Sequence, residues 1–203
     1  MRLLDLFCCC GGISEGFARN GFECTGVDIT DNHKYKHDFI HSSIFKLDID
    51  FMSKFDIIHA SPPCQHYTWA TKKIDRPKHP DLVSRTRHLL KKTGKPFMIE
   101  NVIGAPVRKD LVLCGEMFGL RVIRHRIFET EGFTVMQPAH IKHRPPVTEG
   151  RSYYMQVAGH GGQSYSFKLE DWKKAMDIDW VNDKEHLTQM IPPKYSEYIS
   201  LFI

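Results

Sequence analysis

The stretch that decides the fold is Asp5-Leu-Phe-Cys-Cys-Cys-Gly-Gly-Ile-Ser-Glu-Gly-Phe17. The apolar run 3–7 predicts a buried strand that ends in a glycine-containing turn. Residues 14–20 then predict a helix, with Gly21 as its C-terminal stop. A strand that enters a helix through a Gly-Gly turn lets backbone amides approach a ligand closely. An ordinary strand-to-helix turn accounts for this stretch equally well when it is taken alone.

Apolar runs and helical stretches alternate on either side of this turn. Residues 22–29, 55–60 and 96–102 predict strands, residues 81–92 predict a helix, and residues 193–202 predict a C-terminal helix with a proline pair at its start. Such alternation favours an α/β fold, Rossmann-like, with a mostly parallel central sheet and helices on both faces. Ligands of such folds bind at the carboxyl ends of the strands, so polar residues there matter most.

Length and composition are those of one folded domain. The chain has 203 residues, of which 41% are hydrophobic and 26% are charged. No apolar run approaches the roughly 20 residues that span a bilayer, and Asp5 interrupts the first apolar stretch. We therefore expect a cytoplasmic protein with no membrane contact. Residues 1–130 and 187–203 are assigned to the main domain, and 131–186 to a small irregular insert of short strands and turns around a flexible loop at 158–164.

The six cysteines predict neither disulfides nor a metal centre. Three of them are consecutive, and adjacent cysteines are not easily bridged to each other. We expect reduced thiols. No cysteines form a CxxC pair, and His140 with His143 is a weak ligand pattern, so no metal site is expected.

The net charge of +4 permits a polyanionic partner without requiring one. Basic residues gather in three groups near the polar strand ends. They are Lys72, Lys73, Arg76 and Lys78; Arg121, Arg124 and Arg126; and Lys142 with Arg144. A solvated surface explains any one group, whereas three together favour contacts with phosphates.

Polar residues with chemical potential follow the predicted strands. Asp28 ends one strand, where a carboxylate can accept hydrogen bonds from ribose hydroxyls. Cys64 follows the next strand, between prolines that fix its direction and in a basic loop expected to stabilise a thiolate. Glu100 ends the strand after that and is a candidate acid. Arg124 and Arg126 would share one face of a strand by alternation.

In order and spacing these motifs resemble the DNA cytosine-5 methyltransferases. The shared strings are DLF-x-x-x-GG-x-x-x-GF from Asp5, V-D-I at 27–29, S-P-P-C-Q at 61–65, E-N-V at 100–102, R-x-R at 124–126 and the proline pair at 192–193. The resemblance covers residues 1–130 well and resumes near 187. It is greatest to short, phage-type members that lack a large target-recognition domain, and it implies a methyltransferase fold that uses S-adenosylmethionine.

By this resemblance, the Cys64 thiolate would attack C6 of a flipped-out cytosine, and C5 would then take the methyl group. Glu100 would protonate or hydrogen-bond N3, and Arg126 would hold the base with Arg124 in support. The residues implied in S-adenosylmethionine binding are Phe7, Gly11, Gly12, Asp28, Ile29, Ser43 and Pro62. Those implied in substrate binding are Pro63, Gln65 and Asn101. Residues 62–80 would close over the base.

Four positions depart from the family pattern. Cys9 stands where a glycine is common, and Ser43 stands where an aspartate usually reads the adenine amino group. Gln189 lies in a segment that lacks the usual Gly-Asn before the proline pair, and Val122 replaces a glutamine that often precedes the arginines. The first three bear on cofactor binding and the last on how the arginines are supported.

Three readings of the function remain open at this stage. The first is methylation of cytosine in DNA, most simply duplex DNA with a short recognition site because the insert is small. The second is the same chemistry on RNA or single-stranded DNA. The third is a non-catalytic nucleic-acid or cofactor-binding protein with a decayed site. A dinucleotide oxidoreductase is excluded, since the chain lacks G-x-G-x-x-G and residues that handle a hydride. No obligatory protein partner is evident.

Overall fold

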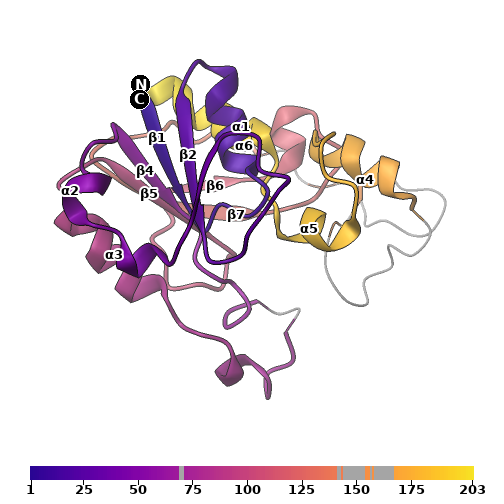
Figure 1. The fold of residues 1–203 in the computed structure, drawn as a ribbon. Helices are drawn as coiled ribbons and strands as arrows, with labels where there is room; N and C mark the ends of the chain where they lie inside the picture. The colour runs from indigo at the N-terminus through magenta and orange to yellow at the C-terminus, as the bar shows by residue number, and fades with distance from the viewer. Residues whose placement is uncertain (69–70, 141–142, 144–153, 156, 158–166) are drawn as a thin grey trace.

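The computed structural model describes the whole chain except residues 69–70, 141–142, 144–153, 156 and 158–166 (Figure 1). Within the described residues the centre is a seven-stranded sheet of order β3-β2-β1-β4-β5-β7-β6. Its parallel strands are β1 (Arg2–Leu6), β2 (Glu23–Asp28), β3 (Asp38–His41), β4 (Ile57–Ala60) and β5 (Phe97–Asn101). Two antiparallel strands, β7 (Arg126–Glu131) and β6 (Leu111–Leu113), complete it. The expected mostly parallel α/β fold is confirmed.

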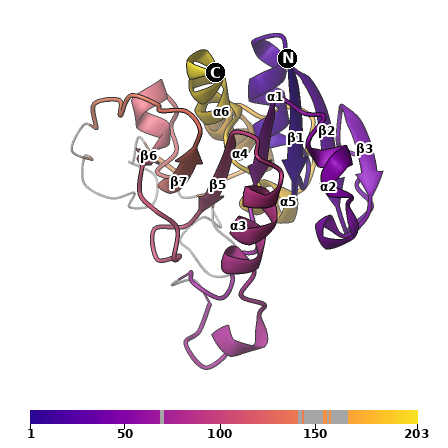
Figure 2. The same cartoon turned by 90° about the vertical axis from the view of Figure 1, so that its left-hand side faces the viewer.

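Helices cover both faces of this sheet (Figures 1 and 2). One face carries α1 (Gly12–Arg19), α6 (Pro193–Ile199) and the 3-10 turn η5 (Ser200–Phe202). The other carries α2 (Ile49–Met52) and α3 (Val83–Lys92). Three further 3-10 turns occur in the described chain, η1 (Ile44–Lys46), η2 (Arg76–Lys78) and η3 (Gly115–Phe118).

The core divides between the two faces of the sheet. Leu3, Ile57 and Met98 point toward α1 and α6, where Phe17 and Tyr195 are fully buried against them. The residues next to these in each strand point the other way, as the two-residue period of a strand requires. They form a second core with α2 and α3, made by Leu4, Leu6, Ile58, Phe97, Ile99, Met52 and Leu90.

Two glycines let α1 lie against α6. A Cβ on Gly12 would come 2.2 Å from the carbonyl oxygen of Ile191, and one on Gly16 would come 2.1 Å from Ser196 Oγ. Either distance is far too short for a contact between non-bonded atoms, so any larger residue would push these segments apart. The glycines of the opening stretch therefore serve the packing of the protein itself as well as the turn.

The insert differs from its prediction. Its described part contains two helices, α4 (Leu169–Met176) and α5 (Lys184–Gln189), and a single-residue bridge of Met155 to Val122 rather than short strands. The boundary expected at residue 186 falls inside α5. A third apolar cluster, which includes Val122, Trp172 and Met176, ties this region to the main domain. The loop expected at 158–164 lies outside the described residues.

No helix in the described part of the chain is both long and apolar enough to cross a membrane. All six cysteines are free thiols.

Candidate active site

A row of polar side chains crosses the face of the sheet that α1 and α6 cover. The strand register pairs Asp5 of β1 with His59 of β4, so both point to this face. Glu100 of β5 is paired with Phe128 of β7, and Arg126 lies two residues before Phe128, so these three share a face as well. The row thus reaches the carboxyl end of β5, where β7 begins.

The cysteine loop begins where β4 ends. The Cys64 carbonyl accepts hydrogen bonds from the backbone N–H groups of Tyr67 and Thr68, each at 2.9 Å, which folds the chain into a turn directly after the thiol. The buried side-chain amide of Asn101 donates to the Pro62 carbonyl at 2.8 Å, and its oxygen accepts from the Val102 N–H at 2.9 Å. β5 therefore holds Pro62 in place, and Cys64, two residues later, is half-buried.

The ionisation of Cys64 differs from the expectation. Burial raises the pKa of the Cys64 thiol, and the positive charges of Arg126 and Arg124 oppose that rise without overcoming it. Glu100 adds to the rise through its negative charge. The basic surroundings are therefore present, but desolvation outweighs them and the resting thiol is protonated.

Glu100 is a buried carboxyl group. Its Oε1 lies 2.9 Å from Arg126 Nε, yet the alignment is that of an ion pair rather than a hydrogen bond, so this buried oxygen lacks a hydrogen-bond partner in the described structure. Burial raises the pKa of Glu100, and Arg126 opposes this only in part. A buried carboxyl group with a raised pKa suits a role as proton donor to a ligand.

The two arginines have different surroundings. Arg124 is buried before the start of β7 and donates to the carbonyl oxygens of Val157 at 2.7 Å and Thr188 at 2.6 Å. Burial, followed by repulsion from Arg126, lowers the pKa of Arg124. Strand alternation does not place this pair, because β7 begins only at Arg126. Arg124 instead connects the insert and α5 to the site.

A buried hydrogen-bonded network was not anticipated from the sequence. His59 Nδ1 lies 2.7 Å from Asp5 Oδ1, Ser14 Oγ donates to Asp5 Oδ2 at 2.6 Å, and Tyr35 Oη lies 2.6 Å from Ser14 Oγ. The other nitrogen of His59 is buried and has no partner in the described structure. A histidine inside the apolar run 55–60 was the signal that could have revealed it.

The turn after β1 has an unusual backbone conformation. Phe7 and Cys9 have positive φ angles of 60° and 48°, a left-handed conformation that costs a non-glycine residue about 1 kcal/mol or more and gathers at functional sites. The Cys9 N–H donates to Asp28 Oδ2 at 3.1 Å and the Thr30 N–H donates to Asp28 Oδ1 at 3.0 Å. The turn and the end of β2 are thus fastened together.

These residues fit a nucleoside-bearing group. Each oxygen of Asp28 has one backbone donor, so both keep lone pairs for ribose hydroxyls. Ile29 is 68% exposed, a large apolar side chain available to a flat ring at the same edge. Ser43 caps η1 by accepting a hydrogen bond from Phe45 N–H, which its hydroxyl can do while donating elsewhere.

Protein atoms occupy the space that a side chain at Gly11 or Gly12 would need. A Cβ on Gly11 would come 2.9 Å from the Tyr35 ring, and the corresponding place on Gly12 is taken by the Ile191 carbonyl. Their contribution to a ligand is thereby restricted to the backbone. Next to Cys64, Pro62 is buried, Pro63 is half-buried and Gln65 is exposed.

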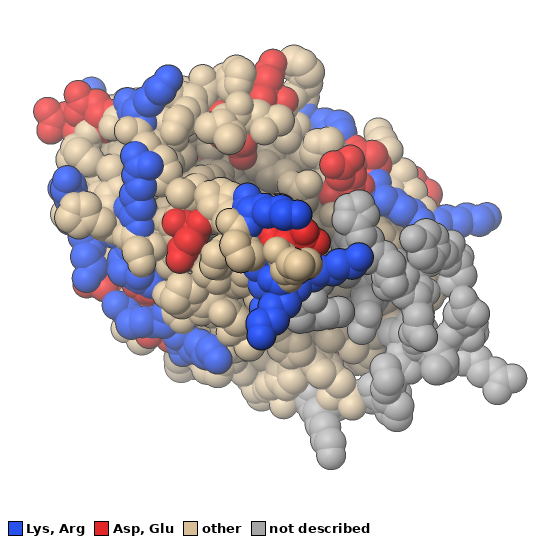
Figure 3. Space-filling view, turned by 90° about the horizontal axis from the view of Figure 1, so that it is seen from below, with Lys and Arg blue, Asp and Glu red and all other residues tan. Residues whose placement is uncertain are grey.

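The first basic group lies on the surface as expected, and the second does so only in part. Lys72, Lys73 and Lys78 are exposed around η2, at the end of the molecule seen in Figure 3, where Lys and Arg gather with some Asp and Glu among them. In the second group Arg124 is buried and cannot contact a phosphate on the surface. Lys142 and Arg144 lie outside the described residues.

Comparison with known proteins places this geometry in a family. The family model for C-5 cytosine-specific DNA methylases matches residues 1–110. The chain is 33% identical over 116 residues to the Type II methyltransferase M.NgoPII of Neisseria gonorrhoeae, over 51% of this chain and 34% of that protein. It is 34% identical over 87 residues to M.HgiGI of Herpetosiphon aurantiacus, over 36% of this chain and 67% of that protein. The chain spans about a third of the length of the first relative.

Solved structures agree with this assignment at the level of the fold. The Entamoeba histolytica methyltransferase EhMeth superposes with a TM-score of 0.66 at 13% identity, over 98% of this chain and 96% of that one. The S. pombe Dnmt2 methyltransferase gives 0.64 at 14% identity, over 99% and 97%. The fold is thus the Rossmann-like methyltransferase fold. With the family model matched over more than half of its length, the chain belongs to the C-5 cytosine-specific DNA methylase family.

Proposed function

We propose that this protein methylates carbon 5 of cytosine in DNA with S-adenosylmethionine as the methyl donor. The observation that carries the proposal is the position of Cys64 just after β4, at the carboxyl edge where the neighbouring strand β5 ends and Glu100 contacts Arg126. Membership of the family supports the reaction class. The choice of DNA as substrate and the covalent mechanism are part of this proposal.

The nucleophile would be the Cys64 thiolate. Cytosine C5 is a weak nucleophile, and addition of sulfur to C6 makes C5 electron-rich enough to accept a methyl group. Because burial raises the pKa of Cys64, the thiol needs help to ionise. Protonation of the cytosine ring at N3 would give that help, since positive charge on the ring favours a thiolate beside it.

Glu100 would be the group that acts at N3. Burial raises its pKa, which favours the protonated form that can donate to N3, and its Oε1 accepts no hydrogen bond within the described structure. Arg126 would orient Glu100 through their contact and bind the base carbonyl with its remaining N–H groups. After methylation, loss of the C5 proton to water, elimination of the sulfur as thiolate and return of the N3 proton to Glu100 would restore the aromatic ring and the free Cys64.

Bound S-adenosylmethionine would supply the electrophilic methyl group. We propose that Asp28 binds its ribose and that Ile29 and Phe7 contact its adenine, with Gly11, Gly12, Ser43 and Pro62 around it. Among the substrate residues, Pro63 and Gln65 remain contacts of the cytosine. Asn101 has both polar atoms bonded within the chain, so we give it the role of positioning the Pro62–Cys64 loop.

DNA would lie against the exposed loop around η2. Lys72, Lys73 and Lys78 can contact phosphates, and Ile74, 81% exposed among them, can contact a base or groove wall. A cytosine in a duplex would have to flip out to reach Cys64. The same site could also act on cytosine in single-stranded DNA or RNA. The contacts in the described structure give no reason to prefer either of these substrates to duplex DNA.

The test is methyl transfer from labelled S-adenosylmethionine to cytosine-containing duplex DNA, with single-stranded DNA and RNA in parallel. We expect 5-methylcytosine in DNA, and no product from Cys64→Ala. Cys24→Ala is the matched control, because Cys24 is a buried thiol away from this edge. Labelling of RNA alone would move the substrate to RNA. Cofactor binding with no transfer to any nucleic acid would overturn the proposal in favour of a decayed site.

A further inference from the structure

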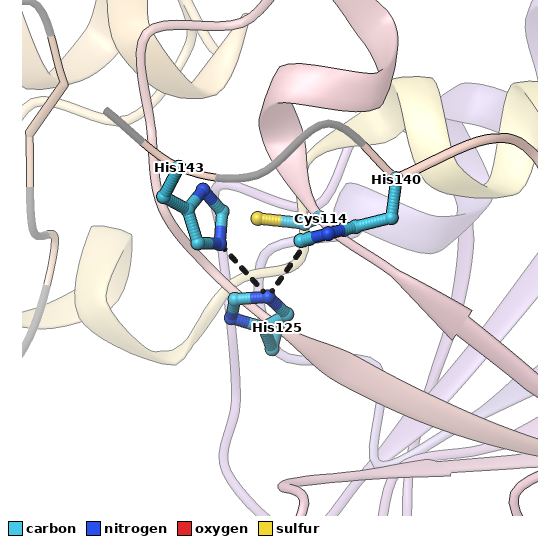
Figure 4. Close-up of side chains that lie close together, drawn as sticks. All are labelled: Cys114, His125, His140 and His143. Carbon is cyan, nitrogen blue, oxygen red and sulfur yellow. Dashed lines mark hydrogen bonds between the residues drawn. The ribbon is translucent and has the colours of Figure 1, made fainter.

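Four potential metal ligands from distant parts of the sequence meet beside β6 and β7 (Figure 4). Cys114 directly follows β6, and His125 directly precedes β7. His140 and His143 come from the first part of the insert. One ligand atom from each of the four lies within 4.8 Å of all the others.

The nitrogen atoms are spaced as metal ligands are. His125 Nε2 lies 3.1 Å from His140 Nε2 and 3.1 Å from His143 Nε2. A tetrahedral zinc ion with Zn–N bonds of about 2.0–2.1 Å separates its nitrogen ligands by about 3.3 Å. These two nitrogen–nitrogen distances are therefore already close to the edge of such a tetrahedron, and the Cys114 sulfur lies within 4.8 Å of the imidazole ligand atoms.

Hydrogen bonding explains this arrangement less well. An imidazole nitrogen carries either one proton or one lone pair, so His125 Nε2 cannot be properly paired with two other nitrogens at once. A metal ion removes the difficulty, because it takes a lone pair from each ring and needs no proton between them.

Glu116 supplies the supporting contact that metal-bound histidines usually have. His143 Nδ1 is hydrogen-bonded to Glu116 Oε2, which leaves its Nε2 lone pair directed at the cluster. The other oxygen of this carboxylate lies 3.4 Å from His140 Nε2, itself one of the candidate ligand atoms, and the Glu116 side chain is 2% exposed. One thiolate and three neutral imidazoles leave a zinc site with a single positive charge, which a buried carboxylate offsets.

The segment that carries the two outer histidines is anchored independently. The Gln137 side chain accepts from the Val112 N–H at 2.9 Å and donates to the Val112 carbonyl at 2.8 Å, and Tyr198 Oη donates to the Met136 carbonyl at 2.8 Å. His125 and His140 also line an open pocket, which gives an ion a path to the cluster.

We propose that Cys114, His125, His140 and His143 bind one zinc ion. One sulfur and three imidazole nitrogens suit zinc, and not the oxygen-seeking Mg²⁺ or Ca²⁺. Four protein ligands complete the coordination, so the ion is structural. It joins the first part of the insert to the ends of β6 and β7. His125 lies between Arg124 and Arg126, so the ion also fixes the backbone that presents the arginines to the active site.

Metal analysis of the untagged full-length protein tests this proposal without any measurement of activity. We expect about one zinc per chain. Cys114→Ser and His140→Ala should lose most of it, whereas Cys24→Ser and His33→Ala, which change residues outside the cluster, should keep it. Equal zinc in the wild type and both cluster variants would overturn the proposal.

Cobalt substitution of the wild type avoids dependence on variants that fail to fold. Removal of zinc with a chelator and addition of Co²⁺ should give the visible bands of tetrahedral cobalt and a thiolate-to-cobalt charge-transfer band. Added Zn²⁺ should displace the cobalt and raise the thermal unfolding midpoint of the metal-free protein. A protein purified without zinc, with no cobalt spectrum and no response to Zn²⁺, would refute the site.

Discussion

Replacing Arg87 with Met should destabilise the protein by about 2–3 kcal/mol. Arg87 of α3 donates from Nε and Nη2 to the two oxygens of Glu129, both at 2.7 Å, and the Glu129 side chain is 0% exposed. This pair fastens α3, which follows the Cys64 loop, to β7, which carries Arg126. Its loss would therefore loosen the contact between the two halves of the candidate site.

The magnitude follows from the remaining partners of Glu129. Breaking a buried ion pair costs about 3–5 kcal/mol because it leaves an unpaired charge. Here Arg87 is 24% exposed, and the Arg108 N–H still donates at 3.1 Å, so about 2–3 kcal/mol is expected. For a chain of this length that corresponds to a fall of about 8 °C in the unfolding midpoint. Met retains the aliphatic packing of the arginine.

The pH dependence gives the prediction its sign. Burial raises the pKa of Glu129, but the hydrogen bonds from Arg87 and Arg108 outweigh it and hold the pKa below its ordinary value. The stability contributed by the pair is thus present above the unfolded-state pKa of about 4.3 and is lost as pH falls through the folded value. The difference between wild type and Arg87→Met should shrink in acid.

Urea unfolding at neutral and acid pH is the assay. Arg85→Met is the control, since Arg85 is exposed and its guanidinium only covers the Phe45 ring at 3.8 Å, for a cost below about 1 kcal/mol. The double change Arg87→Met with Glu129→Gln should recover part of the loss, because the buried charge is gone. A loss no larger than that of Arg85→Met, or one unchanged in acid, would refute the reasoning.

Three further predictions concern the site. Glu100→Gln should lower kcat by about 10²–10⁴ with cofactor affinity unchanged in calorimetry, because an amide can donate to N3 but cannot transfer a proton; a wild-type kcat would remove Glu100 from the chemistry. Cys9→Gly should be more stable than Cys9→Ala by about 1 kcal/mol in urea, since φ is 48° there; an Ala variant of equal stability would contradict this. Because burial raises the pKa of Cys64, the single-turnover rate should increase from about pH 6 to about pH 8; a flat profile would argue against thiolate attack.

The sheet and its covering helices were predictable because each strand is a short apolar run bounded by turn residues. β3 was missed, since an edge strand is half exposed and Asp38 to His41 gives no apolar run. The helices of the insert were missed because glycine and proline around them obscured the period of α4. Tertiary packing, through Trp172 and Met176, decides that region.

The sequence predicts the site residues that belong to a motif, and it does not predict those that only the folded chain brings together. The strand ends located Asp28, Cys64 and Glu100. The direction of the pKa shift of Cys64 could not be predicted from the sequence. Burial raises this pKa more than the arginines lower it, and the extent of burial depends on the fold. The network of His59 with Asp5 depends on strand register, which the sequence does not display.

The four-ligand cluster shows the same limit. His140 with His143 was a weak pattern because half of the set lies elsewhere in the chain, at Cys114 and His125. The antiparallel pairing of β6 and β7 brings those two together, and the segment through Gln137 brings the others to them.

The measurement that tests the central claim most directly is covalent trapping on duplex DNA containing 5-fluorocytosine in the presence of S-adenosylmethionine. The fluorine replaces the proton that must leave from C5, so sulfur cannot be eliminated and the adduct persists. The account predicts a complex that survives denaturing electrophoresis and whose DNA-linked peptide contains Cys64. Absence of any adduct, or an adduct that remains in Cys64→Ala, would contradict it.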